Sequence, residues 1–326
     1  MAKSRMFTSQ DIEKAQRIVY AAMPPTPQFV WPLIAEAAGL EVWVKHENHT
    51  PIGAFKVRGG LVHIKLRHER GETSGVITAT RGNHGQSIPF AARRVGIPVT
   101  IVMPIGNSVE KNAAMRALGA ELHEVGRDFD EAREAAMRMA EERDLSYVPS
   151  FGPDLVLGVS TYAHELFRAA GDLDAVYVPI GMGSGICGVI AARDMLGLKT
   201  RVIGVVAEKA PAYALSFATN GPVATEGAVT FADGLAVRVT NPDALKIIKA
   251  GADGVVTVSE EEIAEAMRLY FRCAHTVAEG AGAASLAALM RERAKFRGKR
   301  AAVILSGGNV DSSKFASVIR GETPRP

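Results

Sequence analysis

Short apolar runs rich in β-branched residues alternate with longer alanine-rich segments from Gly75 almost to the end of the chain, and this alternation constrains the fold more than any other feature. The runs lack the period-2 alternation of a strand that has one face in water. They are therefore typical of strands in a parallel sheet that is covered on both faces. The sequence predicts an α/β fold of doubly wound, mainly parallel sheets.

The individual elements can be placed by residue range. Seven runs are predicted to be strands, and the segments after the first three of them are predicted to be helices. The strands are expected at 76–78, 99–103, 121–125, 175–178, 202–206, 255–258 and 302–305, and the helices at 83–95, 109–118 and 131–142. Ligands of open α/β sheets bind beyond the carboxyl ends of the strands, so the loops there are the places to look for function.

Chain length indicates how these elements are grouped. Single cores usually stop growing at about 250–300 residues, and this chain has 326. A turn-rich stretch at 150–154 separates the first three strand–helix units from the later ones. We therefore expect a small mobile domain of residues 71–149 and a large domain of residues 1–70 and 150–326, with no room after Ala302 for a regulatory domain.

Charge and cysteine content restrict the partners. The formal net charge is +3, and no basic block marks a nucleic acid or a membrane as partner. Cys187 and Cys273 lack the spacing of a metal or redox pair. The sequence contains neither a signal-peptide core nor an apolar run of about 18 residues. A cytoplasmic protein with a small-molecule ligand is expected.

The segment 45–60 has the most unusual composition of the predicted loops. Thr50 and Pro51 indicate a turn together with Gly53, and Lys56 follows Phe55 directly. Lysines are rarely buried. This segment alone is therefore compatible with an ordinary surface lysine.

Three further loops follow predicted strands. The glycine-rich loop 179–188 opens a helical segment, and such turns let backbone N–H groups approach a phosphate. It also matches a dinucleotide fingerprint weakly, with Glu208 as the nearest acidic residue after the next strand. In the loop 80–87, Asn83 is predicted to be a helix N-cap, and in the loop 305–309, Ser306 precedes two glycines.

Taken together and in this order, the loops resemble those of fold-type II pyridoxal-phosphate enzymes, the class of the tryptophan synthase β-subunit, and most closely the threonine/serine dehydratase family that includes serine racemase. The resemblance covers nearly the whole chain. The matching positions are Lys45, Glu47, Gly53, Ala54, Phe55, Lys56, Arg58 and Gly59, then Gly82, Asn83 and His84, then 181–185, and finally 306–309; 232–234 and 279–282 are further family-like segments.

The resemblance implies a role for each matching loop. Lys56 would be the catalytic residue and would hold pyridoxal 5'-phosphate as a Schiff base, with Phe55 beside the ring and Asn83 hydrogen-bonded to the 3′-oxygen. Ser306 would face the pyridine nitrogen. The implied phosphate-binding residues are Gly181, Met182, Gly183, Ser184 and Gly185, and the implied substrate-binding residues are Thr80, Arg81, Gly82 and His84.

The activity implied by the resemblance is that of an ammonia-lyase, which is a carbon–nitrogen lyase. It would convert L-threonine, L-serine or a related 3-hydroxy amino acid to a 2-oxo acid and ammonia by α,β-elimination. The amine of Lys56 is the natural base for the Cα proton, since desolvation can lower the pKa of a lysine toward neutrality. The neutral Ser306 favours elimination over transamination. A catabolic role and a homodimer are further expectations.

Three positions depart from the family pattern. Arg81 stands where the racemase has the serine that reprotonates the opposite face, which argues against racemisation. An arginine there can point to solvent or bind a carboxylate, either the α-carboxylate or a second acidic group, as in 3-hydroxyaspartate; an aryl-serine is another unusual substrate to consider. Glu208 matches the family's divalent-cation site, but Ala214 replaces an aspartate, which weakens the case for Mg²⁺ or Ca²⁺. Met182 and Ser184 replace glycines of the cradle.

Two alternatives stay open at this point. A serine or amino-acid racemase would keep the cofactor but exchange enantiomers, and Arg81→Ser would test it. The other alternative is a nucleotide-binding α/β protein without pyridoxal phosphate, either an NAD-binding protein or a sensor. It would bind its ligand through the loop 181–185, and Lys56 would have no functional role.

Overall fold

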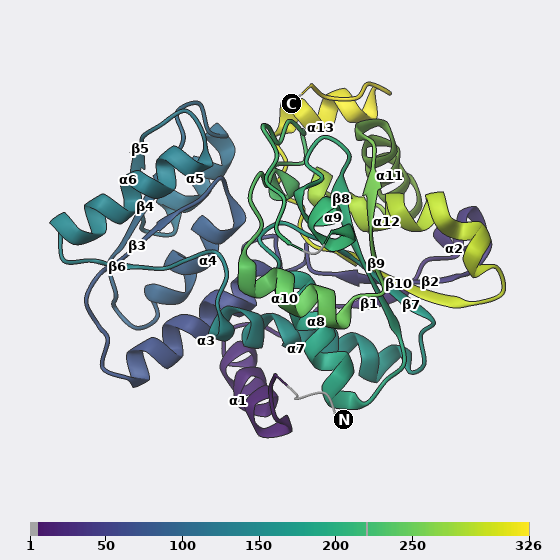
Figure 1. The fold of residues 1–326 in the computed structure, drawn as a ribbon, viewed down its shortest axis with the longest axis horizontal. Helices are drawn as coiled ribbons and strands as arrows, with labels where there is room; N and C mark the ends of the chain where they lie inside the picture. The colour runs from purple at the N-terminus through teal and green to yellow at the C-terminus, as the bar shows by residue number, and fades with distance from the viewer. Residues whose placement is uncertain (1–5, 220, 326) are drawn as a thin grey trace.

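The computed structural model describes residues 6–219 and 221–325, which form two sheets side by side, each between layers of helices (Figure 1). The strand orders are β5-β4-β3-β6 in the small sheet and β1-β2-β10-β7-β8-β9 in the large sheet. Neighbouring strands are parallel, except that β1 and β2 are antiparallel. The strands are β1 (Gln28–Val30), β2 (Glu41–His46), β3 (Val76–Ala79), β4 (Val99–Met103), β5 (Glu121–Glu124), β6 (Ser146–Tyr147), β7 (Ala175–Pro179), β8 (Arg201–Ala207), β9 (Gly254–Val258) and β10 (Arg300–Leu305).

Helices connect the strands and cover both faces of each sheet. The α-helices are α1 (Ser9–Tyr20), α2 (Pro32–Ala38), α3 (Lys56–Glu69), α4 (Asn83–Ala92), α5 (Val109–Ala117), α6 (Phe129–Glu142), α7 (Pro153–Ala170), α8 (Ser184–Leu196), α9 (Ala212–Ala218), α10 (Pro242–Gly251), α11 (Glu260–Ala274), α12 (Gly280–Glu292) and α13 (Ser312–Ile319), with short 3₁₀ turns η1 (Asp233–Leu235) and η2 (Arg293–Phe296). Among the described residues, no helix is both long enough and apolar enough to span a membrane.

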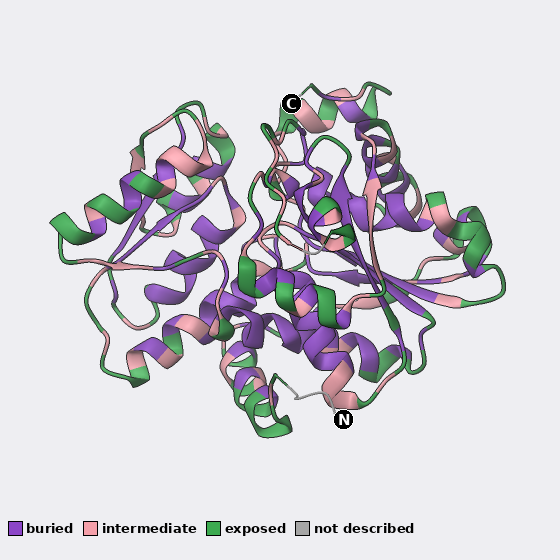
Figure 2. Cartoon of the chain, viewed as in Figure 1, coloured by how far each residue is buried: buried purple, intermediate pink, exposed green. Residues whose placement is uncertain are grey.

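Strand β7 shows why the apolar runs lack alternation. Val176 and Val178 belong to the core that contains residues of α7, α8 and α10, whereas Tyr177 belongs to the core that contains residues of α2, α11 and α12. Successive side chains of a strand point to opposite faces, so each face of this strand needs apolar residues. The strands at the centre of both sheets are buried accordingly (Figure 2).

The predicted α/β fold with mainly parallel sheets is confirmed, and each of the seven predicted runs is a strand. The prediction for the segment 45–60 is partly wrong, because Lys45 and His46 end β2 and Lys56 opens α3. The strands of the small sheet come from residues 76–147 and those of the large sheet from 28–46 and 175–305. The predicted domain boundaries fall between these segments, and the boundaries and the mobility of the small domain stay predictions.

Candidate active site

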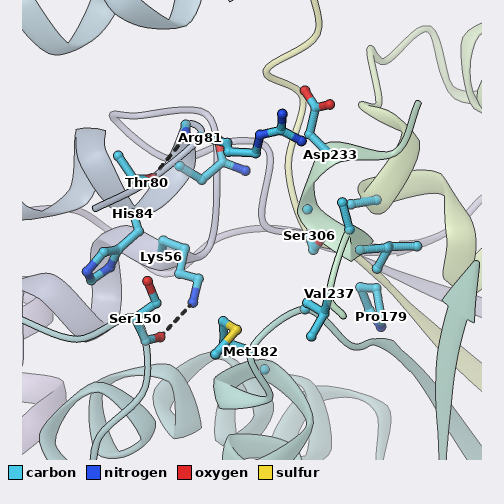
Figure 3. A pocket seen from close by; sticks show the side chains of 18 of the residues that line it. Lys56, Thr80, Arg81, His84, Ser150, Pro179, Met182, Asp233, Val237 and Ser306 are labelled. Carbon is cyan, nitrogen blue, oxygen red and sulfur yellow. Dashed lines mark hydrogen bonds between the residues drawn. The ribbon is translucent and has the colours of Figure 1, made fainter. Parts of the chain in front are cut away.

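A pocket of about 140 Å³ lies where the loops after four strands meet (Figure 3). The loops follow β2, β3, β7 and β10, and α5 and η1 contribute further side chains. All four loops singled out in the sequence therefore converge. The predicted cofactor and substrate residues that line the pocket are Phe55, Lys56, Thr80, Arg81, Gly82, Asn83, His84, Gly181, Met182, Gly183, Ser184, Gly185 and Ser306.

Lys56 is a half-buried side chain at the start of α3. Its Nζ donates to Ser184 Oγ at 3.0 Å and to the carbonyl oxygen of Ser150 at 3.3 Å. Burial lowers the pKa of the Lys56 ammonium to about 8. The interpretation of Lys56 as a surface-loop lysine is wrong, and an appreciable fraction of its amine is neutral near pH 7 and available as a base or nucleophile.

A buried ionic cluster fixes the helix turn that carries Lys56. Arg58 Nε lies 2.7 Å from Glu47 Oε2, and Arg58 Nη1 lies 2.6 Å from Glu165 Oε1. Lys45 Nζ lies 2.5 Å from the other oxygen of Glu165. These charges are paired with one another and do not line the pocket, so they position α3 rather than take part in chemistry.

The glycine-rich turn before α8 brings its backbone close to the pocket. Gly183 is the N-cap of α8 with φ +101°, and a Cβ there would lie 2.6 Å from the Cβ of Ala244. A Cβ on Gly181 would lie 2.3 Å from the carbonyl oxygen of Gly234. Both positions therefore require glycine. A helix N-terminus with accessible N–H groups fits a phosphate.

Phe55 and Ser306 line the pocket together, next to this turn. The Phe55 backbone N–H donates to the carbonyl oxygen of Ser306 at 3.0 Å. A Cβ on Gly185 would lie 3.6 Å from Phe55 Cζ, so the aromatic ring packs directly against the cradle. Ser306 is buried and presents a neutral hydroxyl group to the pocket.

Asn83 is held from two sides. Its Nδ2 donates to Glu279 Oε1 at 2.6 Å, and its Oδ1 accepts from Asn309 Nδ2 at 2.8 Å. The prediction of Asn83 as N-cap is wrong, because Gly82 occupies the N-cap of α4. The side chain is engaged by residues about 200 positions away, so it turns into the pocket instead of capping its own helix.

Thr80 and His84 flank the same helix start. Thr80 Oγ1 accepts from the backbone N–H of Gly82 at 3.0 Å and of Gly85 at 3.2 Å, so this hydroxyl shapes the loop. Both ring nitrogens of His84 are buried without a hydrogen-bond partner of normal geometry. Burial and the nearby charge of Lys56 lower the pKa of His84 to about 3, against a smaller opposite effect of the Val148 backbone. His84 is therefore a neutral, unsatisfied polar group in the pocket wall.

A charged cluster outside the predicted site residues also lines the pocket. Lys111 Nζ lies 3.0 Å from Asp233 Oδ2 and 3.9 Å from Glu279 Oε2. Burial alone would lower the pKa of Lys111, but Glu279 and Asp233 more than offset it and raise it. Burial raises the pKa of Glu279. Asp233 and Glu279 lie in segments noted as family-like, whereas no local signal distinguishes Lys111 from other helix lysines.

The predicted metal role of Glu208 is not supported. Its carboxylate is half exposed and lies 3.4 Å from Arg291 Nη1. In the described ranges 6–219 and 221–325, no group of three or more His, Cys, Asp or Glu side chains is arranged to hold a metal ion. Ala214, which replaces the aspartate of the family's cation site, packs against the apolar core.

Fold and site together define a class. A lysine of lowered pKa, a glycine cradle at a helix N-terminus, an asparagine held in the pocket and a neutral serine are the parts that a pyridoxal-phosphate enzyme of fold type II requires, and the residues present fit this cofactor. The family described as "Pyridoxal-phosphate dependent enzyme" matches residues 19–307, and the chain belongs to this family. The nucleotide-binding alternative is therefore wrong.

Individual relatives place the chain in the ammonia-lyase and racemase branch of the family. It is 36% identical to an L-threonine ammonia-lyase of Thermotoga maritima over 96% of this chain and 78% of the relative. It is 33% identical to an L-threo-3-hydroxyaspartate ammonia-lyase of a Pseudomonas species over 97% of this chain and the whole relative. The solved structure of a pyridoxal 5'-phosphate-dependent aspartate racemase superposes with a TM-score of 0.87 at 30% identity and covers 94% of this chain and 97% of that chain. Ammonia-lyases are carbon–nitrogen lyases.

Proposed function

We propose that the protein is an ammonia-lyase that converts L-threonine, L-serine or a related 3-hydroxy amino acid to a 2-oxo acid and ammonia, by α,β-elimination of water and hydrolysis of the enamine that results. The observation that carries this proposal is Lys56, a buried amine whose pKa is lowered to about 8 and whose hydrogen-bond partners are a hydroxyl and a carbonyl rather than a carboxylate. Such an amine can both bind an aldehyde carbon and take up a proton near neutral pH.

The residues that would hold pyridoxal phosphate come from four segments. Lys56 would bind its aldehyde carbon, the turn at 181–185 and the start of α8 its phosphate, and Asn83 its ring oxygen. When bound, the cofactor supplies an electron sink that weakens the bonds at the substrate's Cα. Ser306 would offer the ring nitrogen a neutral partner, which favours elimination.

The start of α4 is the proposed site for the substrate's α-carboxylate. The backbone N–H groups of Asn83 and His84 stand in the first turn of α4, where N–H groups have no intrahelical acceptor. The unpartnered ring of His84 supplies a further polar group beside them. Lys56 lines the same pocket, so a carboxylate bound here would share that pocket with its amine.

Lys56 would then take the Cα proton. The Cα–H electrons form the new bond to Cβ, the Cβ–O bond breaks, and the hydroxyl leaves as water with one added proton. The released enamine hydrolyses to a 2-oxo acid and ammonia. Ser184 Oγ, 3.0 Å from Lys56 Nζ, would hold the amine in position between the two steps.

A racemase is the alternative within the same family. It would need a second proton donor on the face opposite Lys56, and Arg81 occupies the corresponding position. A guanidinium group stays protonated under all ordinary conditions and cannot exchange this proton. We therefore favour elimination over racemisation.

We also propose that the chain forms a homodimer through the edge of the large sheet. Phe29 in the edge strand β1 and Leu33 in the following helix α2 are 47% and 52% exposed, and a second chain would cover them. Sedimentation of the wild-type protein and of Leu33→Glu tests this point, with a monomeric wild type as the contrary result.

The experiment that tests the function uses protein saturated with pyridoxal phosphate. L-threonine should yield 2-oxobutyrate and L-serine should yield pyruvate, each with one equivalent of ammonia. Lys56→Ala should yield neither a 2-oxo acid nor ammonia. Formation of D-amino acids without ammonia would favour the racemase, and no reaction with any 3-hydroxy amino acid would refute the proposal.

A further inference from the structure

We propose that Arg81 binds a carboxylate group on the substrate's side chain, so that the preferred substrate is a dicarboxylic 3-hydroxy amino acid. This inference rests on the proposed function and names the class of substrate for the same pocket. It starts from the charges that line the pocket.

Arg81 is an arginine that lines the pocket, and its charge acts on Asp233 from beyond ion-pair distance. It makes no hydrogen bond and no ion pair with any residue that the structure describes. Lys111, in contrast, is paired with Asp233 at 3.0 Å and lies 3.9 Å from Glu279. Asp233 is thus already paired with a lysine, and Glu279 accepts a hydrogen bond from Asn83 Nδ2.

Asp233 is the nearest candidate for a protein partner of Arg81, and Figure 3 shows the Arg81 side chain extending toward it. The two side chains form no ion pair, while Asp233 is paired with Lys111 and also lies 4.0 Å from Lys314. An additional anion in the pocket would therefore meet an arginine whose donors are unused. A guanidinium binds a carboxylate through two parallel hydrogen bonds.

Arg81 also stands at the junction of two cavities. A second cavity of about 260 Å³ shares Arg81, Phe129, Met182, Ala236 and Val237 with the main pocket. The other arginines of the second cavity are neutralised, since Arg133 lies 3.3 Å and Arg238 2.7 Å from carboxylate oxygens of Asp130. A side chain that extends from the reaction centre toward the second cavity would pass Arg81 first.

The α-carboxylate has its own proposed site at the start of α4. Arg81 lies outside this helix start and forms no ion pair of its own among the described residues, so it can bind a second anionic group. We expect a substrate with a side-chain carboxylate to gain roughly 10- to 100-fold in affinity over a neutral one of the same shape.

Binding of L-aspartate and L-asparagine to the holoenzyme tests the inference directly. The two amino acids have nearly the same shape, differ in side-chain charge and lack a 3-hydroxyl group to eliminate. Calorimetry should give at least tenfold tighter binding of L-aspartate to the wild type. The preference should disappear in Arg81→Met, persist in part in Arg81→Lys and stay within threefold of wild type in Arg133→Met, which removes a paired arginine.

Turnover provides the second measurement. The ratio of kcat/KM for L-threo-3-hydroxyaspartate to that for L-threonine should fall at least tenfold in Arg81→Met and stay within threefold in Arg133→Met. Equal weakening of L-aspartate and L-asparagine by Arg81→Met would overturn the inference, because it would assign Arg81 to the α-carboxylate. A wild type without preference for L-aspartate would overturn it as well. A binding preference that depends on Arg81 in an enzyme that eliminates no 3-hydroxy amino acid would support the carboxylate site and refute the proposed function.

Discussion

Replacing Lys56 by methionine is expected to abolish activity and to make the apoprotein more stable. The pKa of Lys56 is about 8 against an ordinary value of 10.5, and each tenfold change in proton affinity corresponds to 1.36 kcal/mol. The charged ammonium therefore destabilises the folded apoprotein by about 3 kcal/mol at pH 7. Methionine has a similar length and no charge, so Lys56→Met should recover most of this free energy of unfolding.

The stability difference between Lys56→Met and wild type should decrease as the pH rises. Below pH 8 the lysine is protonated in both the folded and the unfolded protein, so the destabilisation is constant. Between about pH 8 and 10.5 the folded protein releases the proton while the unfolded chain keeps it, so wild-type stability rises with pH. The advantage of Lys56→Met should shrink to about 1 kcal/mol at pH 9.5.

Urea unfolding of both apoproteins at pH 7 and pH 9.5 measures these differences. Lys246→Met, which removes an exposed lysine of α10, is the matched control and should change the free energy of unfolding by less than about 0.5 kcal/mol at either pH. A Lys56→Met apoprotein that is less stable than wild type at pH 7, or whose gain is the same at both pH values, would refute the argument that a desolvated ammonium is stored in this pocket.

Two further substitutions probe the surroundings of Lys56. Gly183→Ala should weaken pyridoxal-phosphate binding at least tenfold in a fluorescence titration, because the φ of +101° and the 2.6 Å approach to Ala244 exclude a Cβ at this position. Gly197→Ala is the control. Gly197 is the C-cap of the same helix, also has a positive φ and has open space around it, so the affinity should stay within threefold of wild type. Lys111→Met should raise the pKa of Glu279 further, since Lys111 is the cation that lowers it, and should therefore shift the acidic limb of the kcat profile to higher pH, whereas an unshifted limb would separate Glu279 from catalysis.

The parts of the fold that follow from local pattern are the parts that the sequence predicts. The apolar strands could be recognised because both of their faces are buried. Strand β1 has three residues and β6 has two, too few for any periodicity, and both were missed. The last two residues of β2, Lys45 and His46, lie in the segment predicted to be a loop; the charge of Lys45 is matched by Glu165, 120 residues away.

The candidate site shows the same division. Glycine turns and the motif around Lys56 are local, so their positions could be predicted. The orientation of Asn83 could not, because its partners are Glu279 and Asn309, which are distant in the chain. Lys111 carries no local signal, since its role arises from the acidic groups that the fold places opposite it.

The central position of β10 has a consequence for how the molecule is made. β10 lies between β2 and β7, and its residue Arg300 contacts Glu41, which precedes it by 259 positions. At a synthesis rate of about 5–20 residues per second, β10 is synthesised roughly 10–50 s after β2. The edge of β2 is unpaired during this interval, and the edge of β7, which is made about 120 residues before β10, is unpaired for roughly the second half of it; both can pair with other chains. The small sheet is complete once Tyr147 has been synthesised, so it can form long before β10 exists. A nascent chain would then carry one folded sheet and one incomplete sheet whose unpaired strands chaperones can bind.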